Sequence, residues 1–214
     1  MLIETSLTSA DLNDVGPRAA ALEVAGYDVL TTQENRHDPY LPLAVAATTT
    51  TTSTLATSVA IAFPRSPMIT ANVGWDLQRA SRGRFELGLG SQVKGHNERR
   101  FSVPWSAPAP RMQEYVAAVR AIWRSWHEGE PLAFAGEHYG FSLMPPNFTP
   151  EPLVDGMTPP ASPSLPSDRP CSGWRDGCVT VSASTRSAPV PTPRPQFCPS
   201  WTAGSTSRAA AGTS

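Results

Sequence analysis

Cysteine is scarce in this chain and is poorly placed for a structural role. Its three cysteines, Cys171, Cys178 and Cys198, all lie in the last third of the sequence, and the first 152 residues contain none. An odd number without metal-type spacing supplies neither a disulfide framework nor a zinc site. We therefore interpret these cysteines as incidental thiols and predict no metal.

Strong charge and long apolar runs are also missing. The formal net charge of -1 gives no electrostatic reason to expect nucleic acid or an acidic membrane surface as a partner. No apolar run approaches the roughly 18 residues that a membrane helix needs. The first residues, MLIETSLTSADLND, lack the basic segment of a signal peptide. We therefore expect a cytoplasmic protein that binds neither nucleic acid nor a membrane.

The composition of the chain changes near Pro152. Residues 153–214 contain no Glu and no Lys, and prolines recur between positions 159 and 170 and again between 189 and 199. Such a segment cannot bury enough apolar surface to offset its chain entropy. This pattern predicts an irregular, disordered tail rich in Pro, Ser and Thr over residues 153–214, and a folded part over residues 1–152.

A slip of the reading frame is a second explanation of the tail. If the codons of Gly173–Arg186 are read one nucleotide earlier, the genetic code allows the string LAG-[RW]-VCDGVRVHP. Continuing through Ser187–Gly212 allows further strand-like and helix-like patterning, with acidic residues that the visible tail lacks. We favour this explanation, with the slip around Leu153–Asp155, because a structural pattern returns over the whole tail at once.

Apolar and polar segments alternate regularly before Pro152. Strand-like segments are expected at Leu2–Leu7, Tyr27–Thr31, Leu55–Phe63 and Arg84–Leu89. Helical patterns are expected at Asp11–Gly26, Leu41–Ala47, Ser66–Ala80 and Arg111–Trp126, and a small hairpin at Leu132–Phe141. Four strand–helix units in succession predict an α/β fold with a parallel sheet, either half of a barrel or a small doubly wound sheet.

In a βα barrel, chemistry is expected on the loops that follow the strands. The loop after the second strand contains His37 and Asp38, which could transfer protons or hydrogen-bond a heteroaromatic cofactor. The alternative is a polar loop in which Asp38 makes an Asx turn before Pro39. Local sequence alone favours this alternative.

The third and fourth strands end in small residues. Ala60-Ile61-Ala62 would let a flat ring lie against the backbone, although a plain loop with a helix cap at Ser66 is the commoner outcome. Gly88 and Gly90 allow close backbone approach, but a lone GxG is weak evidence for a phosphate site. The stretch that follows either contacts an anionic cofactor or is a solvated face; it contains Gln92, Lys94, His96, Arg99 and Arg100.

These segments resemble the luciferase-like monooxygenase superfamily, specifically its branch dependent on the deazaflavin coenzyme F-420. The resemblance is carried by ALEVAGYDVLTTQENRHDPYLPLAVAA, by TSVAIAFPRSPMITANVGWDLQRASRGRFELGLGSQVKGHNERRF and by PWSAPAPRMQEYVAAVRAIW. RGRFELGLGSQ is a specific signature, and HDPYLPLA together with PRSP narrows the branch. The similarity covers about Leu2–Pro152, roughly the first half of a full family member.

The resemblance implies a (β/α)8 TIM barrel that holds flavin or deazaflavin at the carboxyl ends of its strands. This chain would be an incomplete barrel of about four βα units. The resemblance places the catalytic pair near the reactive ring and the cofactor-binding residues at the third and fourth strand ends, where members often have a non-proline cis peptide behind the ring. The catalytic pair is His37 and Asp38, and the cofactor-binding residues are Ser58, Val59, Ala60, Gly88, Gly90 and Gln92.

The implied function is that of an oxidoreductase or monooxygenase that transfers a hydride to or from a small organic substrate. F-420 is the expected cofactor, with FMN as the alternative, and members of the family are commonly homodimers. The visible tail departs from the family pattern, because it lacks the phosphate-binding loops expected after strands seven and eight. The alternatives are therefore a truncated, catalytically inactive fragment, or a small binding module of another class.

We predict that the gene contains the alternative reading frame. Sequencing its DNA across codons 150–214 should give the LAG-x-VCDG string in the frame that starts one nucleotide earlier, because that string is itself similar to a later strand and loop of the family. Codons that forbid this string would end the frame-slip explanation and leave a Pro-rich linker.

Overall fold

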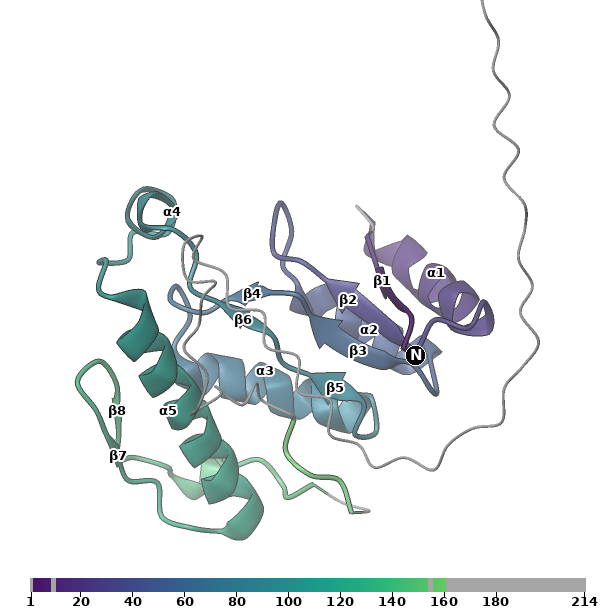
Figure 1. Cartoon of the computed structure of the whole chain (residues 1–214). Helices are drawn as coiled ribbons and strands as arrows, with labels where there is room; N and C mark the ends of the chain where they lie inside the picture. The colour runs from purple at the N-terminus through teal and green to yellow at the C-terminus, as the bar shows by residue number, and fades with distance from the viewer. Residues whose placement is uncertain (1, 9–10, 154–155, 161–214) are drawn as a thin grey trace, which may run out of the picture. The chain divides into compact units, whose positions relative to one another are not determined.

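A computed structural model describes residues 2–8, 11–153 and 156–160, all of which belong to one compact unit of the chain. Four parallel strands form the main sheet in the order β1–β2–β3–β5 (Figure 1). Their bounds are Glu4–Ser6 for β1, Val29–Thr32 for β2, Thr54–Thr57 for β3 and Phe85–Glu86 for β5. Because each strand pairs in parallel with its neighbour, the carboxyl ends of all four lie at one edge of the sheet. The predicted parallel sheet is confirmed.

Two of the predicted strands are each divided into two shorter ones. The apolar run expected as one strand at Leu55–Phe63 forms β3 and then, after a break, β4 (Ala60–Ile61). The run expected at Arg84–Leu89 forms β5 and then β6 (Leu89–Gly90). β4 and β6 pair in parallel with each other. The prediction of unbroken strands was wrong, because apolar periodicity does not register a local change of backbone direction.

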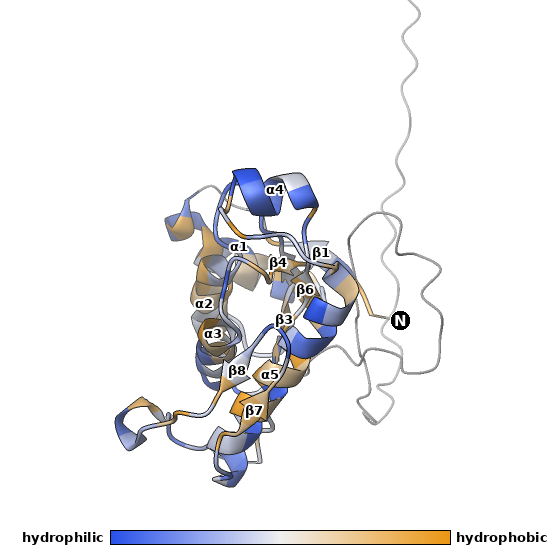
Figure 2. Cartoon of the chain, turned by 90° about the vertical axis from the view of Figure 1, so that its left-hand side faces the viewer, coloured by the Kyte–Doolittle hydropathy of each residue, from blue (hydrophilic) through white to orange (hydrophobic). Residues whose placement is uncertain are grey.

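The helices lie close to their predicted positions. They are α1 (Leu12–Val24), α2 (Tyr40–Thr49), α3 (Pro67–Ala80), α4 (Lys94–Arg99) and α5 (Pro108–Glu128). In Figure 2, α1, α2 and α3 lie along one side of the sheet. The short α4 was not predicted, because a six-residue polar helix carries no apolar period. None of the described helices has both the length and the apolar character needed to cross a membrane.

Helix boundaries follow from side-chain caps and glycine. The carboxylate of Asp11 accepts a hydrogen bond from the Asn13 backbone N–H at 2.9 Å, and α1 begins at the next residue, Leu12. Ser66 caps α3 in the same way. α5 ends at Glu128 and is capped by Gly129, whose φ of 72° lies in the left-handed region that glycine adopts without steric cost.

The core lies between the sheet and its helices. Leu30, Leu55 and Phe85 of the strands are almost fully buried, as are Leu43 of α2 and Trp75 of α3. Each such side chain contributes about 1.5–3 kcal/mol of hydrophobic stabilisation relative to exposure. The sheet is therefore fastened to its helix layer by ordinary apolar packing.

Gly74 allows α3 and α5 to approach closely. A Cβ atom at Gly74 would lie 2.9 Å from the Trp123 ring, which is closer than carbon atoms can pack. The ring nitrogen of Trp123 donates a hydrogen bond to the Ala71 carbonyl at 3.0 Å. The close packing of α3 on α5 therefore requires glycine at position 74, because a side chain there would collide with the Trp123 ring.

The chain continues beyond α5 as a hairpin and an extended segment. The predicted hairpin is confirmed: β7 (Phe134–Ala135) pairs antiparallel with β8 (Gly140–Phe141), and a 3-10 turn follows at Pro146–Phe148. Packing on α3 extends past Pro152, because Gln78 donates to the Thr158 carbonyl at 2.8 Å. The division into 1–152 and 153–214 stays a prediction, and residues 161–214 lie outside the described part.

Two charged side chains hold the loop between α2 and β3 at the amino end of the sheet. The Glu23 carboxylate accepts hydrogen bonds from the backbone N–H groups of Thr51, Thr52 and Ser53 at 2.6–2.9 Å. Arg84 donates to backbone carbonyls of the same connection. Burial by itself would raise the pKa of Glu23, but the backbone donors outweigh it and lower the pKa from 4.5 to about 2.

We predict that Glu23→Gln destabilises the fold by about 1–2 kcal/mol at neutral pH, a figure reduced for solvent screening. A carboxylate whose pKa is lower when folded contributes stability above its unfolded pKa. That contribution is lost as the pH falls from 4.5 toward about 2. Urea unfolding at several pH values measures the effect.

Glu98→Gln is the matched control, because Glu98 is paired only loosely with Lys94 at 3.9 Å on an exposed helix. We expect a change below about 0.5 kcal/mol for it. A Glu23 variant whose deficit persists unchanged near pH 2 would contradict the assignment.

Candidate active site

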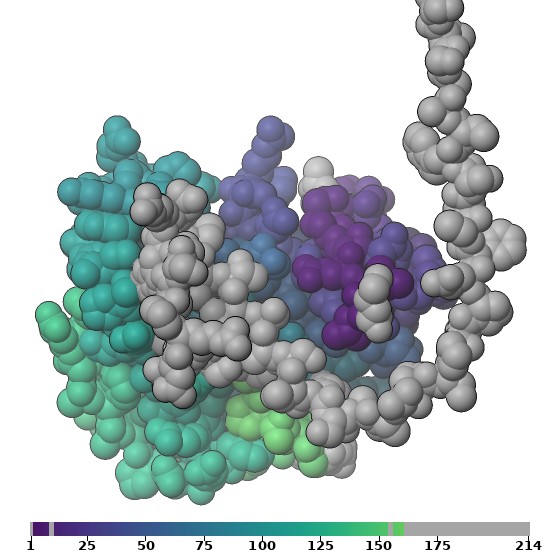
Figure 3. Space-filling view, in the orientation of Figure 1, coloured from purple at the N-terminus to yellow at the C-terminus, as the bar shows by residue number. Residues whose placement is uncertain are grey.

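The loop after β2 rises from the carboxyl edge of the sheet, at the same end as α4 (Figures 1 and 3). It contains His37, whose side chain is exposed, and Asp38, which is half-buried. One oxygen of Asp38 accepts hydrogen bonds from the backbone N–H groups of Tyr40 at 2.8 Å and Leu41 at 3.2 Å. Asp38 therefore makes the Asx turn that the alternative predicted, and its carboxylate accepts from the first two N–H groups of α2. The catalytic role predicted for the pair stays a prediction.

The break between β3 and β4 lies at Ser58–Val59, which are joined by a non-proline cis peptide bond. This bond falls in the segment where the family resemblance implied one. The Ser58 N–H donates to the Thr32 carbonyl at 2.7 Å, and the Ala60 N–H donates to the Gly88 carbonyl at 2.9 Å. The segment Ser58–Ala60 therefore joins the end of β2 to the connection between β5 and β6.

Gly88 and Gly90 are required by close contacts with that segment. A Cβ atom on Gly88 would overlap the Thr57 backbone carbonyl, and one on Gly90 would lie 2.7 Å from the Val59 side chain. The Thr57 hydroxyl also bridges the N–H and the carbonyl of Gly88, at 2.8 and 2.7 Å. The predicted binding residues Ser58–Ala60, Gly88 and Gly90 thus lie together, and we call this set the strand-end shelf.

Gln92 follows the shelf in a left-handed backbone conformation, with a φ of 58°. Its side-chain oxygen accepts from the neighbouring Val93 N–H at 3.0 Å. Beyond α4, Arg100 donates to the carbonyl of Asn35 in the loop after β2, at 2.9 Å. Arg100 therefore joins the loop after β6 to the loop that contains His37.

Sequence reasoning gave no role to two charged residues of this edge, Glu34 and Arg65. They form an ion pair at 2.6 Å, and the Glu34 side chain is only 8% exposed. Arg65 stands two residues after the predicted third strand, in the PRSP motif, and Glu34 stands three residues before His37. Opposite charges at neighbouring strand ends were a usable signal, because parallel strands bring such loops together.

Tyrosines below this edge are buried. Burial raises the pKa of the Tyr40 hydroxyl well above its ordinary value, partly offset by the charge of Arg65. Burial also raises the pKa of Tyr115, whose hydroxyl contacts that of Thr70 at 2.5 Å. Both phenols therefore stay protonated at neutral pH. The Tyr115 hydroxyl is hydrogen-bonded to Thr70, whereas the Tyr40 hydroxyl is buried without a hydrogen-bond partner among the residues that the structure describes.

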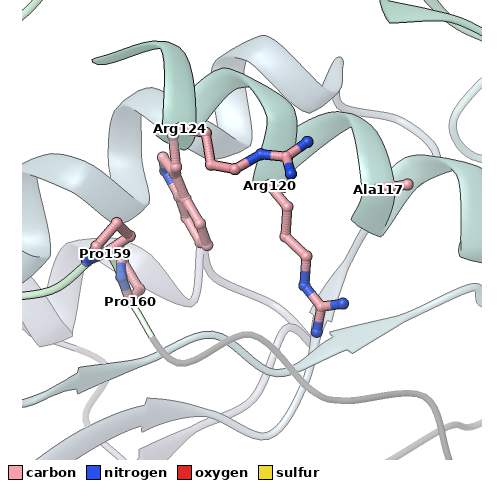
Figure 4. Close-up of a pocket in the computed structure, with 6 residues that line it drawn as sticks. Ala117, Arg120, Arg124, Pro159 and Pro160 are labelled. Carbon is pink, nitrogen blue, oxygen red and sulfur yellow. The ribbon is translucent and has the colours of Figure 1, made fainter. Parts of the chain in front are cut away.

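A cavity of about 420 Å³ lies between α5 and the segment that contains Pro159 and Pro160 (Figure 4). It contains none of the predicted site residues. Its lining is Ala117, Arg120, Trp123, Arg124, Pro159 and Pro160. In the part of the chain that the structure describes, no three His, Cys, Asp or Glu side chains are grouped so as to hold a metal ion.

Parallel βα units with converging strand-end loops define an α/β-barrel type of enzyme framework. Residues 3–163 match the luciferase-like monooxygenase family. This match covers more than half of the chain, and the chain belongs to that family.

Relatives of known sequence occur in mycobacteria. An uncharacterized protein of Mycobacterium tuberculosis is 56% identical over 134 residues, which are 63% of this chain and 39% of the relative. A phthiodiolone/phenolphthiodiolone dimycocerosates ketoreductase of Mycobacterium kansasii is 30% identical over 159 residues, 67% of this chain and 43% of the relative. The chain spans about two-fifths of the length of these curated relatives.

Solved structures confirm an incomplete TIM-barrel fold. The monooxygenase RslO1 from Streptomyces bottropensis aligns with a TM-score of 0.61 at 20% identity, over 76% of this chain and 52% of that protein. A coenzyme F420 dependent tetrahydromethanopterin reductase from Methanopyrus kandleri gives 0.53 at 19%, over 65% and 43%. The oxygenating constituent of 3,6-diketocamphane monooxygenase from Pseudomonas putida, in complex with FMN, gives 0.58 at 17%, over 68% and 45%.

We predict that Gly88→Ala costs more stability than Gly90→Ala. The new methyl group at position 88 would meet a backbone carbonyl, whereas the one at position 90 would meet a Val59 methyl group that can shift. We expect losses of about 3 kcal/mol and about 1–2 kcal/mol, respectively. Urea unfolding checks the order.

Gly140→Ala is the control, since the nearest atom to a Cβ atom there is the Phe134 carbonyl oxygen at 3.9 Å. Its effect should stay within about 0.5 kcal/mol. Equal losses at positions 88 and 140 would show that the close approach at the shelf is not needed for folding.

Proposed function

We propose that this chain carries the ring-binding half of an F-420-dependent oxidoreductase that transfers a hydride to or from a small organic substrate. The observation that carries the proposal is the strand-end shelf: Ser58–Ala60, Gly88 and Gly90 meet at the carboxyl edge, beside the His37 loop. The proposed assembly of the parent enzyme is a homodimer.

The residues of the shelf fit a flat heteroaromatic ring. Glycine and alanine keep side chains off the surface, and the surface is held rigid by backbone hydrogen bonds such as that from Ala60 to Gly88. Rigid support is what a binding site for a planar group needs, because movement of about 1 Å misaligns the reacting atoms. When bound, a deazaflavin supplies hydride transfer at its central carbon.

The chain's own residues would position the ring and the substrate. Ser58, Val59 and Ala60 would support the ring from behind, and Gly88 and Gly90 would let it approach the backbone. His37, which is exposed at the same edge, would donate or accept a hydrogen bond at the ring or the substrate. Asp38 would act by keeping the turn before α2 in place, because one of its oxygens already accepts from the Tyr40 and Leu41 N–H groups.

FMN is the second candidate cofactor. Both ligands share a three-ring planar system, so the shelf by itself does not discriminate between them. One structural relative is described as dependent on coenzyme F420, and another was solved in complex with FMN. We favour F-420 because HDPYLPLA and PRSP resemble that branch.

A truncated, inactive fragment is the competing function. The chain spans only about two-fifths of its curated relatives. Four barrel positions provide about half of the strands of an eight-stranded barrel, and the cofactor's phosphate groups would need contacts from elsewhere. This candidate predicts a folded chain that binds neither ring.

Titration of the full chain with F-420 and with FMN separates the candidates. We expect saturable quenching of the deazaflavin fluorescence, with a dissociation constant on the order of micromolar for F-420 and a larger one for FMN. Gly90→Val should weaken F-420 binding by about tenfold or more, because its side chain would occupy the shelf.

Gly140→Val is the matched control, because it adds the same atoms at an open position of the hairpin. Saturable binding that both valine variants retain would place the cofactor elsewhere. A folded wild-type chain that quenches neither cofactor would favour the inactive fragment.

A further inference from the structure

Arg65 joins two carboxylates that belong to the loop after β2. Its guanidinium contacts Glu34 at 2.6 Å and Asp38 at 3.0 Å through different nitrogens. Glu34 stands near the beginning of that loop and Asp38 near its end, and His37 lies between them. One side chain therefore holds both ends of the segment that presents His37.

Glu34 connects the same loop to the strand-end shelf. Its backbone N–H donates to the Val59 carbonyl at 3.2 Å. Its carboxylate accepts from the Ile61 N–H at 2.7 Å, through the oxygen that also contacts Arg65. The loop is thus fastened to both sides of Ala60, the centre of the predicted ring-binding segment.

Arg65 is itself held in place by its surroundings. Its backbone N–H donates to the Ala62 carbonyl at 2.9 Å, and a guanidinium nitrogen donates to the Ile61 carbonyl at 2.9 Å. The guanidinium also lies over the Tyr40 ring, 5.4 Å from its centre. Burial alone would lower the pKa of Arg65, but the hydrogen bond and the charge of Glu34 outweigh it and raise the pKa above its usual range. The arginine therefore stays charged and ordered.

A planar guanidinium suits this position better than an ammonium group. Arginine offers several N–H groups in a fixed plane, so it contacts Glu34, Asp38 and the Ile61 carbonyl at once. Lysine presents one point charge and would satisfy one carboxylate well. Removal of the charge would leave the nearly buried Glu34 carboxylate without its ion partner.

We propose that Arg65 is a positioning residue, which fixes the His37 loop relative to the strand-end shelf through Glu34 and Asp38. The part of this inference that concerns the ring rests on the proposed function. It goes beyond that function by naming the side chain that sets the distance between the loop and the ring. Arg65 acts through Glu34 and Asp38, and the reacting groups would be held by other residues.

Amide hydrogen exchange in the full chain tests the holding role without any cofactor. We expect Arg65→Met to accelerate exchange at the Glu34 and Ile61 amides by about tenfold or more, because their hydrogen-bonded arrangement opens more often. The Leu55 amide in the centre of the sheet should keep its wild-type rate. Arg65→Lys should restore part of the protection at Ile61.

Arg79→Met is the matched control. Arg79 pairs with Glu151 at 2.8 Å on the surface of α3, far in the sequence from the loop, and its loss should leave all these amides unchanged. Wild-type exchange at Glu34 and Ile61 in Arg65→Met would overturn the inference.

If Arg65→Met does not fold, the Glu34→Gln variant decides, because it keeps a neutral acceptor for the Ile61 N–H while removing the charge paired with Arg65. Faster exchange at Tyr40 and Leu41 in Glu34→Gln supports the inference, and wild-type rates there overturn it.

Cofactor titration then tests the positioning role. In a wild-type chain that binds F-420, Arg65→Met should raise the dissociation constant by about tenfold and change the visible circular dichroism of the bound ring, and Arg65→Lys should recover part of both. Unchanged binding and dichroism in Arg65→Met, despite faster exchange, would overturn the positioning role. A wild-type chain that binds no cofactor defeats the proposed function instead, and the exchange data still decide whether Arg65 holds the loop.

Discussion

Parallel hydrogen bonding between β1, β2, β3 and β5 sets the direction of the loops that connect these four strands with their helices. Each strand runs the same way, so each helix must return the chain to the amino edge, and each new loop emerges at the carboxyl edge. This is why residues as far apart in sequence as Asn35 and Arg100 come within 2.9 Å. The site depends on that geometry more than on any single side chain.

The two edges of the sheet use charge for different purposes. At the amino edge, Glu23 is surrounded by backbone donors and Arg84 by carbonyls, an arrangement that satisfies loop backbone and stabilises the fold. At the carboxyl edge, Arg65 links Glu34 and Asp38, which belong to a loop that stands out from the surface. An ion network there orders a segment that has little apolar packing of its own. In βα barrels generally, residues at the amino edge contribute to stability, and the loops at the carboxyl edge carry the chemistry.

Small residues and charged residues have complementary roles at the carboxyl edge. Gly88 and Gly90 remove side-chain bulk where the strands come closest, beside the Thr57 carbonyl and the Val59 side chain. Glu34 binds to the neighbouring segment, at Val59 and Ile61, through its backbone N–H and its carboxylate. For the proposed redox cofactor, which carries its own chemistry, such residues would supply position and polarity.

The sequence by itself determined the class of fold and the alternation of its main strands and helices, and it led to a prediction of where the site lies. Apolar periodicity, helix caps and glycine stops are local properties, so the α/β alternation and the end of α5 at Gly129 could be read directly. The family signature RGRFELGLGSQ was the basis for predicting which strand ends form the site. Only the tertiary structure showed that β3 and β4 are separate strands and that Arg65 reaches Glu34. These features depend on contacts between residues about 30 positions apart, such as Ala60 with Gly88 and Glu34 with Arg65. A single sequence has no local pattern that reports the distance between two loops.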